Sequence, residues 1–254
     1  MVSFQLPVLG LVLVMALAPL GLAGVRPARN AHSPPDHHKS NLPSPKFVGL
    51  GTRYGAHCRE EDCWQTGACS FVNYTLPATV EGSTCVSEDI WNNGGHCGGC
   101  ISVSYQGRTI TVMVTNLTGG KSTHLDMAPA TWAKLTNGYH GGGADGIEWR
   151  WVRCPLDESV PLAIHMHAGS SKQWFAATVE NATLRTASLD VSADGGKTWR
   201  RAVREMFNMY VLRDALPDDV DRAWVRVTSI SGSQVTVPDV VVDGGHITQA
   251  AANY

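Results

Sequence analysis

The cysteines constrain the fold of this chain more than any other sequence feature. The 254 residues include seven cysteines, of which six lie between Cys58 and Cys100 and the last is Cys154. Clustered cysteines in an exported chain are typical of a disulfide framework. A zinc site would need a second cysteine or histidine pair, and none follows the CGGC segment at residues 97–100. We therefore expect disulfides and no metal, with one thiol left free or bonded outside the chain.

The N-terminal segment predicts export. Residues 1–24 are apolar and uncharged, and small residues at positions 21, 23 and 24 suit a signal-peptidase site, so we predict a signal peptide over 1–24. An uncleaved membrane anchor is the alternative, although Pro19 and Gly21 interrupt the end of the apolar run. Residues 25–46 are rich in Pro, Ser, His and Asn, which predicts a disordered leader. The expected product is secreted and extracellular.

Composition excludes some partners. The net charge of -2 and a pI near 6.5 indicate no nucleic-acid or anionic-membrane surface. No amphipathic helix or exposed apolar strand suggests a second copy, so we expect a monomer. Three N-x-[ST] sequons, at Asn73, Asn116 and Asn181, fit a secretory route.

Residues 47–154 form the cysteine-bearing block. Segments 100–105 and 108–117 alternate with period two around Gln106-Gly107, which predicts a β-hairpin. Residues 127–138 predict a helix, with Pro129 in its first turn and Asn137-Gly138 at its end. Asp126 directly precedes this helix. One role open to Asp126 is therefore a helix N-cap, worth about 1 kcal/mol.

Residues 161–243 contain no cysteine and follow a short polar linker at 155–160. Strand-like runs turn at residues 194–196 and 231–233, and this regular spacing predicts a β-sandwich. His165 and His167 share one strand face, but without a third ligand we expect no metal there. Residues 244–254 are expected to form a loose tail.

Seven motifs together resemble one family. They are GTRYG (51–55), GAC (67–69), GGHCGGC (94–100), VTNL (114–117), HLDMAP (124–129), WRWVRCP (149–155) and GSSKQWFAATV (169–179). In this order they resemble expansins and expansin-like proteins over residues 47–243. The resemblance implies a mainly β protein: a six-stranded double-psi β-barrel related to family 45 endoglucanases, followed by an immunoglobulin-like, carbohydrate-binding β-sandwich. It also implies non-hydrolytic loosening of cell-wall polysaccharide (cellulose, xyloglucan or another matrix glucan), with no cofactor.

The resemblance assigns the central role to Asp126, which matches the general acid of the related hydrolases. Inverting hydrolysis also needs a base about 6.5–9.5 Å away, and the matching position here is Ala56. We therefore expect Asp126 to bind a glucan without cutting it. The resemblance places four further polysaccharide-binding residues beside it: Thr52, Tyr54, Asn116 and His124. Asn116 stands where the family usually has Asp, so it can hydrogen-bond a sugar but cannot act as an acid.

The resemblance also implies a linear aromatic surface and a disulfide pattern. Trp174, Phe175 and Phe207 match the aromatic positions, whose faces would stack on glucose rings. Consecutive strand residues face opposite ways, so a core position is the alternative for Phe175. The implied disulfides are Cys69–Cys97 and Cys100–Cys154, with Cys58–Cys63 added across the REED loop and Cys85 left single.

Three alternatives stay open. A glycan-cleaving enzyme on the same barrel, an endoglucanase or a lytic transglycosylase, could act on glucan or, with less support, on peptidoglycan. A carbohydrate-binding protein without loosening activity is the second. A barwin-type defence protein is the third, although those lack a second domain. We expect glycans at Asn73 and Asn181 but not at Asn116, where a glycan would obstruct the groove.

Overall fold

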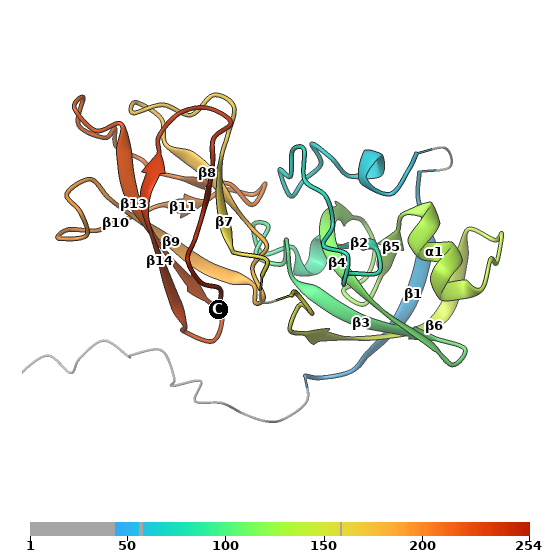
Figure 1. Ribbon diagram of the computed structural model, residues 1–254. Helices are drawn as coiled ribbons and strands as arrows, with labels where there is room; N and C mark the ends of the chain where they lie inside the picture. The colour runs from blue at the N-terminus through green and yellow to red at the C-terminus, as the bar shows by residue number, and fades with distance from the viewer. Residues whose placement is uncertain (1–43, 56–57, 158) are drawn as a thin grey trace, which may run out of the picture. The chain divides into compact units, whose positions relative to one another are not determined.

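The computed structural model describes residues 44–55, 58–157 and 159–254. The predicted signal peptide, almost all of the predicted leader, and Ala56 lie outside these residues. The regular structure of the described part is mostly β-strand, arranged as a closed barrel followed by two antiparallel sheets (Figure 1). The predicted mainly β fold class is confirmed.

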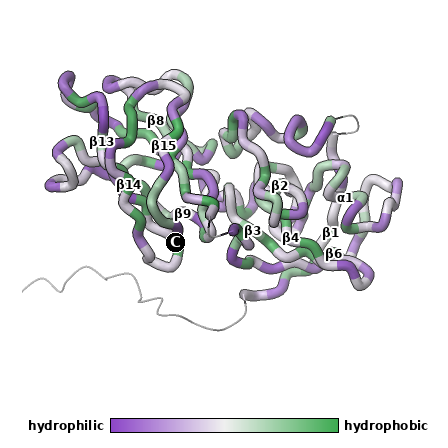
Figure 2. Tube along the Cα trace, in the orientation of Figure 1, coloured by the Kyte–Doolittle hydropathy of each residue, from purple (hydrophilic) through white to green (hydrophobic). Residues whose placement is uncertain are grey.

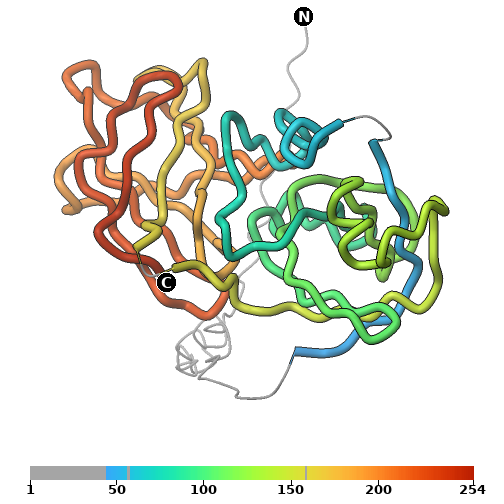
Figure 3. The backbone as a smooth tube through the Cα atoms, turned by 45° about the vertical axis from the view of Figure 1, so that its right-hand side comes forward, coloured from blue at the N-terminus to red at the C-terminus, as the bar shows by residue number. Residues whose placement is uncertain are grey.

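The barrel has the strand order β1-β5-β2-β4-β3-β6. Its strands are β1 (Phe47–Arg53), β2 (Ser83–Ser87), β3 (Cys100–Tyr105), β4 (Arg108–Thr118), β5 (Leu125–Met127) and β6 (Gly143–Val152). The β1–β5 and β2–β4 pairs are parallel, and the others are antiparallel. In Figure 3, β1 (blue) can be followed beside its partner β6 (yellow-green). The predicted β3–β4 hairpin is present, and Gln106 and Gly107 both have positive φ in its turn.

Alternating apolar residues fill the barrel. Ile101 and Val103 on β3 and Val112 and Val114 on β4 are fully buried in one core cluster. Burying such a side chain contributes about 1.5–3 kcal/mol. Hydrophobic colour accordingly follows these strands in Figure 2, and much of the hydrophilic colour lies on the outer loops.

The predicted helix is α1 (Pro129–Thr136), and Asn137 ends it in the left-handed conformation at φ 56°. Its buried Trp132 and Leu135 pack into the barrel core, as their spacing requires. Two short 3-10 helices, η1 (Glu61–Cys63) and η2 (Glu88–Ile90), complete this region.

The second region consists of a four-stranded sheet, β10-β9-β13-β14, and a five-stranded sheet, β11-β12-β8-β7-β15. Their strands are β7 (Ala163–Met166), β8 (Ala176–Glu180), β9 (Thr186–Ser192), β10 (Arg200–Arg201), β11 (Val203–Arg204), β12 (Tyr210–Val211), β13 (Arg222–Ser229), β14 (Gln234–Val241) and β15 (Ile247–Gln249). The β9–β10 and β13–β14 pairs are the two hairpins predicted from the turns. A separate core cluster includes Ile164, Leu189 and Val225.

The prediction that residues 244–254 form a loose tail is wrong. Within them β15 pairs antiparallel with β7, and the Ala250 amide donates to the Leu162 carbonyl at 2.8 Å. The Asn253 side chain also accepts from the Thr183 amide at 2.9 Å. The backbone of this segment thus completes the edge of a sheet, an outcome that its three-residue alternation was too short to predict.

Three disulfides lie in the barrel region: Cys58–Cys63, Cys69–Cys97 and Cys100–Cys154. The resemblance implies the second and third of these pairs, and the first is the pair expected across the REED loop. Cys85 is free and buried. Disulfides of this kind are typical of extracellular proteins.

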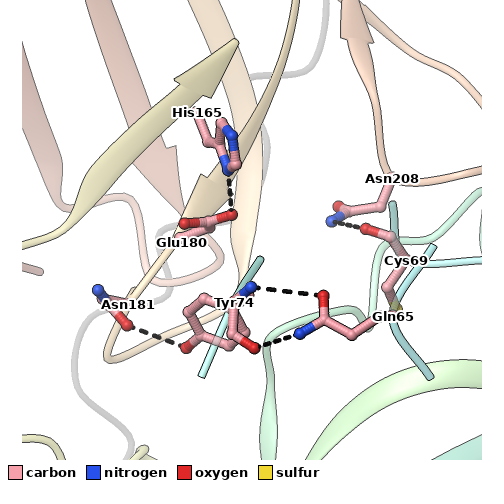
Figure 4. A network of polar contacts seen from close by, with 7 residues as sticks. All are labelled: Gln65, Cys69, Tyr74, His165, Glu180, Asn181 and Asn208. Atoms are coloured by element: carbon pink, nitrogen blue, oxygen red, sulfur yellow. Dashed lines mark hydrogen bonds and ion pairs between the residues drawn. The ribbon is translucent and has the colours of Figure 1, made fainter. Parts of the chain in front are cut away.

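Hydrogen bonds join the barrel loops to the sandwich (Figure 4). The Tyr74 hydroxyl donates to Asn181 Oδ1 of the sandwich at 2.9 Å, and within the barrel loops Gln65 Nε2 donates to the Tyr74 carbonyl at 2.6 Å. The Asn208 side chain donates to the Cys69 carbonyl at 3.2 Å. Close by on the sandwich, His165 and Glu180 pair at 2.7 Å and are both largely buried.

Two aromatic rings and a guanidinium group form a stack that is another contact between the barrel region and the sandwich. The His96 ring lies 4.6 Å from the Trp151 ring, and the Arg185 guanidinium covers Trp151 at 4.2 Å. Burial, followed by the nearby Arg185 and Arg204 charges, lowers the pKa of His96 to about 4. The His96 ring is therefore neutral in the folded protein at neutral pH.

Within the part of the chain that the structure describes, no helix has the length and apolar character needed to cross a bilayer. The same residues contain no group of three or more His, Cys, Asp or Glu side chains arranged to hold a metal ion.

Candidate functional site

Four polar residues lie at one register level across neighbouring barrel strands. Thr52 on β1 pairs with Asp126 on β5, which pairs with Cys85 on β2, and Cys85 pairs in turn with Asn116 on β4. Residues paired in this way place their side chains on the same face of the sheet. Since Leu125 and Met127, on either side of Asp126, are fully buried in the core, Asp126 points to the outer face. We call these four residues the polar row.

Neutral hydroxyl groups surround the Asp126 carboxylate. The Thr52 hydroxyl donates to Oδ1 at 2.6 Å, and the Thr118 hydroxyl donates to Oδ2 at 3.3 Å. The N-cap of α1 is Ala128, and Asp126 belongs to β5 instead. The alternative role of Asp126 as helix cap is therefore wrong, and its partly exposed carboxylate remains open to a ligand.

His124 lies on the other side of the Thr52 hydroxyl. Its Nε2 is 2.8 Å from Thr52 Oγ1, and its Nδ1 is 2.7 Å from the Gly119 carbonyl oxygen. Gly120 has φ +99°, and a Cβ there would lie 2.6 Å from His124 Nδ1. Glycine at position 120 thus leaves room for the imidazole ring, and Thr52 links the ring to Asp126.

Cys85 is a member of the row that sequence reasoning did not assign to the site. Burial raises the pKa of the Cys85 thiol, and the charge of Asp126 raises it further, so the thiol is neutral. Burial also raises the pKa of Tyr54, with Cys85 and Glu60 adding to the effect. The Tyr54 hydroxyl is enclosed and has no hydrogen-bond partner among the described residues. The only charge in the polar row is consequently that of Asp126.

The Asn116 side chain forms a hydrogen bond with the neighbouring loop that contains Ala68. Its Oδ1 accepts from the Ala68 amide at 2.8 Å and from the Leu117 amide at 2.9 Å. A Cβ on Gly67 would lie 2.7 Å from Asn116 Nδ2, so the loop passes very close to this side chain. The predicted hydrogen bond to a sugar would therefore come from Nδ2. The oxygen already fixes the GAC loop, which we define as residues 67–70.

Glu60 is a second carboxylate near the site that the sequence did not single out. It accepts from the Ser83 amide at 2.8 Å, and from the Thr131 hydroxyl at 2.7 Å and amide at 3.3 Å. Both carboxylate oxygens are thus occupied, and Glu60 ties the segment before η1 to β2 and α1. No sequence signal marks this role, because it depends on contacts across 23 and 71 residues.

The predicted aromatic surface is only partly present. Trp174 is 39% exposed and Phe207 is 52% exposed. Phe175 is 1% exposed and belongs to the sandwich core, so its assignment to the binding surface is wrong. The reason is strand geometry: consecutive residues leading into β8 face opposite sides. Trp174 faces outward, and the His167 ring meets it edge-on at 5.2 Å.

The loop that carries Phe207 contacts the GAC loop. The Ser70 hydroxyl donates to the Phe207 carbonyl at 2.7 Å, and Asn208 donates to the Cys69 carbonyl at 3.2 Å. The GAC loop therefore contacts Asn116 at one end and the Phe207 loop at the other. This connection relates the polar row to the exposed aromatic residues of the sandwich.

No family model matches the chain. An expansin-like protein of Dictyostelium discoideum is 25% identical over 161 residues, which cover 60% of this chain and 54% of that protein. The chain thus aligns with about half the length of this curated relative.

Two solved structures match a larger part of the chain. Apo expansin from Clavibacter michiganensis has a TM-score of 0.70 at 24% identity, covering 82% of this chain and 98% of that chain. A point mutant of the same expansin, in complex with cellohexaose, has a TM-score of 0.71 at 24% identity with the same coverage. The chain is thus similar in sequence to an expansin-like protein and has the fold of a bacterial expansin.

Proposed function

We propose that this protein is secreted, binds cellulose-type β-glucan in the cell wall, and loosens the contacts between its chains without cutting them. The glucan would lie over the polar row and extend toward Trp174 and Phe207. The cellohexaose complex of the structurally similar expansin supports this substrate class. No cofactor is needed for such an activity, and the predicted monomeric state stays a prediction.

One observation carries this proposal: the polar row presents a single carboxylate among neutral neighbours. Asp126 accepts from two hydroxyl groups, and the adjacent Cys85 thiol is neutral. Inverting hydrolysis requires a second carboxylate that activates water. We do not expect Glu60 to supply it, because three donors from Ser83 and Thr131 surround its Oε1, whereas each oxygen of Asp126 accepts from one hydroxyl only. A site with one carboxylate can hydrogen-bond a glucan and compete for its interchain hydrogen bonds.

Adsorption to cellulose tests the binding part of the proposal. The mature protein should adsorb to microcrystalline cellulose, and Trp174→Ala should weaken adsorption because it removes a stacking face. Tyr139→Ala is a matched control, since Tyr139 is 52% exposed but lies beyond the end of α1. Equal adsorption of the two variants would contradict the proposed surface.

For the enzymatic alternative, Glu88 is the candidate for the base that activates water. It is exposed, and its Oε1 lies 3.9 Å from where a Cβ on Gly119 would be, beside the carbonyl that contacts His124. If glycan cleavage is detected, Glu88 is the first candidate base, and Glu88→Gln should abolish it. Cleavage that survives Glu88→Gln would exclude Glu88 as the base.

The predicted glycosylation sites differ in their exposure. Asn73 is exposed, whereas Asn181 is partly buried and its Oδ1 accepts from Tyr74. Thr183 of the Asn181 sequon is buried as well. We propose Asn73 as the principal glycan site and an unmodified Asn116.

A further inference from the structure

The contacts of the Thr52 hydroxyl set a minimum number of hydrogens shared among Asp126, Thr52 and His124. A hydroxyl carries one hydrogen and can donate it to only one acceptor. Here Oγ1 contacts two groups that can both act as acceptors, Asp126 Oδ1 at 2.6 Å and His124 Nε2 at 2.8 Å. One of these two groups must therefore donate to Thr52 if both contacts are hydrogen bonds.

The other nitrogen of His124 fixes the remaining hydrogen. Nδ1 lies 2.7 Å from the Gly119 carbonyl oxygen, which can only accept. Nδ1 therefore carries a hydrogen. Nε2 can then donate to Thr52 only when the ring is a doubly protonated imidazolium.

Two arrangements satisfy all three contacts. In one, an ionised Asp126 accepts from Thr52, which accepts from the His124 imidazolium. In the other, a protonated Asp126 donates to Thr52, which donates to the neutral ring. They interconvert when the Nε2 proton moves to Thr52 and the hydroxyl proton moves to Asp126 Oδ1. Both arrangements hold the same number of protons, one more than an ionised carboxylate beside a neutral imidazole.

We propose that Asp126, Thr52 and His124 share one proton, so that His124 neutralises the only charge of the polar row. This inference rests on the proposed function and deepens it, because the ligand is an uncharged glucan. Covering an isolated carboxylate costs free energy, since the ion loses its water. A carboxylate balanced by the shared proton can be covered at lower cost. His124 is then a positioning residue that acts on Asp126 through Thr52.

The other titratable groups around the network do not replace this proton. On β2, burial and the Asp126 charge raise the pKa of Cys85, which remains a neutral thiol. After β1, burial raises the pKa of Tyr54, which remains a neutral phenol. Glu88 lies toward Gly119, and Lys121 is exposed on the loop that precedes His124. Among the described residues, no Lys or Arg side chain forms an ion pair with Asp126 that could neutralise it in place of His124.

Nuclear magnetic resonance of the mature full-length chain tests the proposal directly. The ¹⁵N shifts of the His124 ring and the ¹³Cγ shift of Asp126 report which atoms carry hydrogens at neutral pH. We expect a hydrogen on Nδ1 together with one shared proton, seen as an imidazolium beside a carboxylate or as a neutral ring beside a carboxylic acid. An ionised Asp126 beside a neutral ring would overturn the proposal.

Matched variants separate the proton from the structure. In Asp126→Asn the side-chain amide can donate to Thr52, so the ring should become neutral with its hydrogen on Nδ1. Thr52→Ser should keep the native ring signals, and Thr52→Val should lose them while backbone amide spectra show the fold intact. A ring that is identical in the native protein, Asp126→Asn and Thr52→Val would contradict the shared proton.

Cellohexaose titration distinguishes this inference from the proposed function. We expect Thr52→Val to lower cellohexaose affinity about 2- to 10-fold, the usual effect of one lost hydrogen bond, and Thr52→Ser to retain it. If the native protein holds the shared proton but does not bind cellohexaose, the proposed function is contradicted and the inference is not. Tight binding without a shared proton would contradict the inference alone.

Discussion

Thr52 and Asp126 occupy paired positions on the parallel strands β1 and β5, and a hydrogen bond of 2.6 Å joins Thr52 Oγ1 to Asp126 Oδ1. The two residues are 74 positions apart in the sequence, so this contact depends on the closure of the barrel. The same register brings Cys85 and Asn116 into line with them. Hydrogen bonding across the barrel therefore defines the proposed glucan site.

Trp174 and Phe175 should have opposite phenotypes although they are neighbours. Trp174→Ala removes an exposed face and should weaken cellulose adsorption by about 0.5–1.5 kcal/mol, with little change in stability. Phe175→Ala leaves a cavity in the core and should lower the free energy of unfolding by about 3–5 kcal/mol. Adsorption isotherms and urea unfolding measure the two effects. A fully stable Phe175→Ala variant that fails to adsorb would contradict the corrected assignment.

Asn116 should act on the GAC loop through its side-chain oxygen. Asn116→Ala removes the acceptor of the Ala68 amide and should lower the free energy of unfolding by about 1 kcal/mol. Amide hydrogen exchange at Ala68 should become faster in this variant. Asn116→Asp keeps an acceptor at the same place, so Ala68 should stay protected. The account fails at this point if Ala68 exchanges equally slowly in Asn116→Ala and in the native protein.

His96 should make the fold sensitive to acid. Its pKa is about 4 in the folded protein, below the ordinary value of about 6.5 that applies to the unfolded chain. The unfolded state consequently binds a proton first as the pH falls, and stability should decline between about pH 6.5 and pH 4. The loss should reach about 2 kcal/mol, a figure reduced for partial solvent exposure of the ring.

Urea unfolding at a series of pH values measures this effect. His96→Asn cannot take up the proton, so its stability should decline less than that of the native protein over the same range. The carboxylates common to both proteins cancel in the comparison. Parallel pH profiles for the two proteins would exclude His96 as a source of acid sensitivity.

The disulfides should differ in their contribution to stability. Cys100–Cys154 spans 54 residues and Cys58–Cys63 spans 5. In the chain-entropy description, replacing each pair by serines should cost about 4 and about 2 kcal/mol, respectively. Thermal and urea unfolding of the two double variants, with the native protein as reference, measure the difference. The opposite order would show that native-state contacts of Cys58 and Cys63 dominate.

Local patterns were sufficient to predict much of the fold. The β3–β4 hairpin followed from period-two alternation around Gln106-Gly107, and α1 from Pro129, the apolar spacing and Asn137. These elements depend on neighbours in the sequence. The motifs then indicated that Asp126 and Thr52 belong to one site, although their hydrogen bond could not be derived from spacing.

Features that depend on long-range register were missed. Cys85 joins the site because β2 pairs with both β4 and β5, which no local signal shows. Glu60 is similar, since its partners Ser83 and Thr131 are distant in the sequence. Phe175 shows the converse: the family motif predicts an exposed aromatic residue, strand alternation after Trp174 predicts a buried one, and Phe175 is buried.

The most direct test of the central claim is the extension of a clamped cellulose–glucan strip under constant load, with reducing ends counted in the same bath. The native protein and Asp126→Asn are compared at equal amounts of adsorbed protein. We predict extension without sugar release by the native protein, and loss of extension in Asp126→Asn. Sugar release that depends on Asp126 would contradict the account, because the proposal excludes cleavage of the glucan.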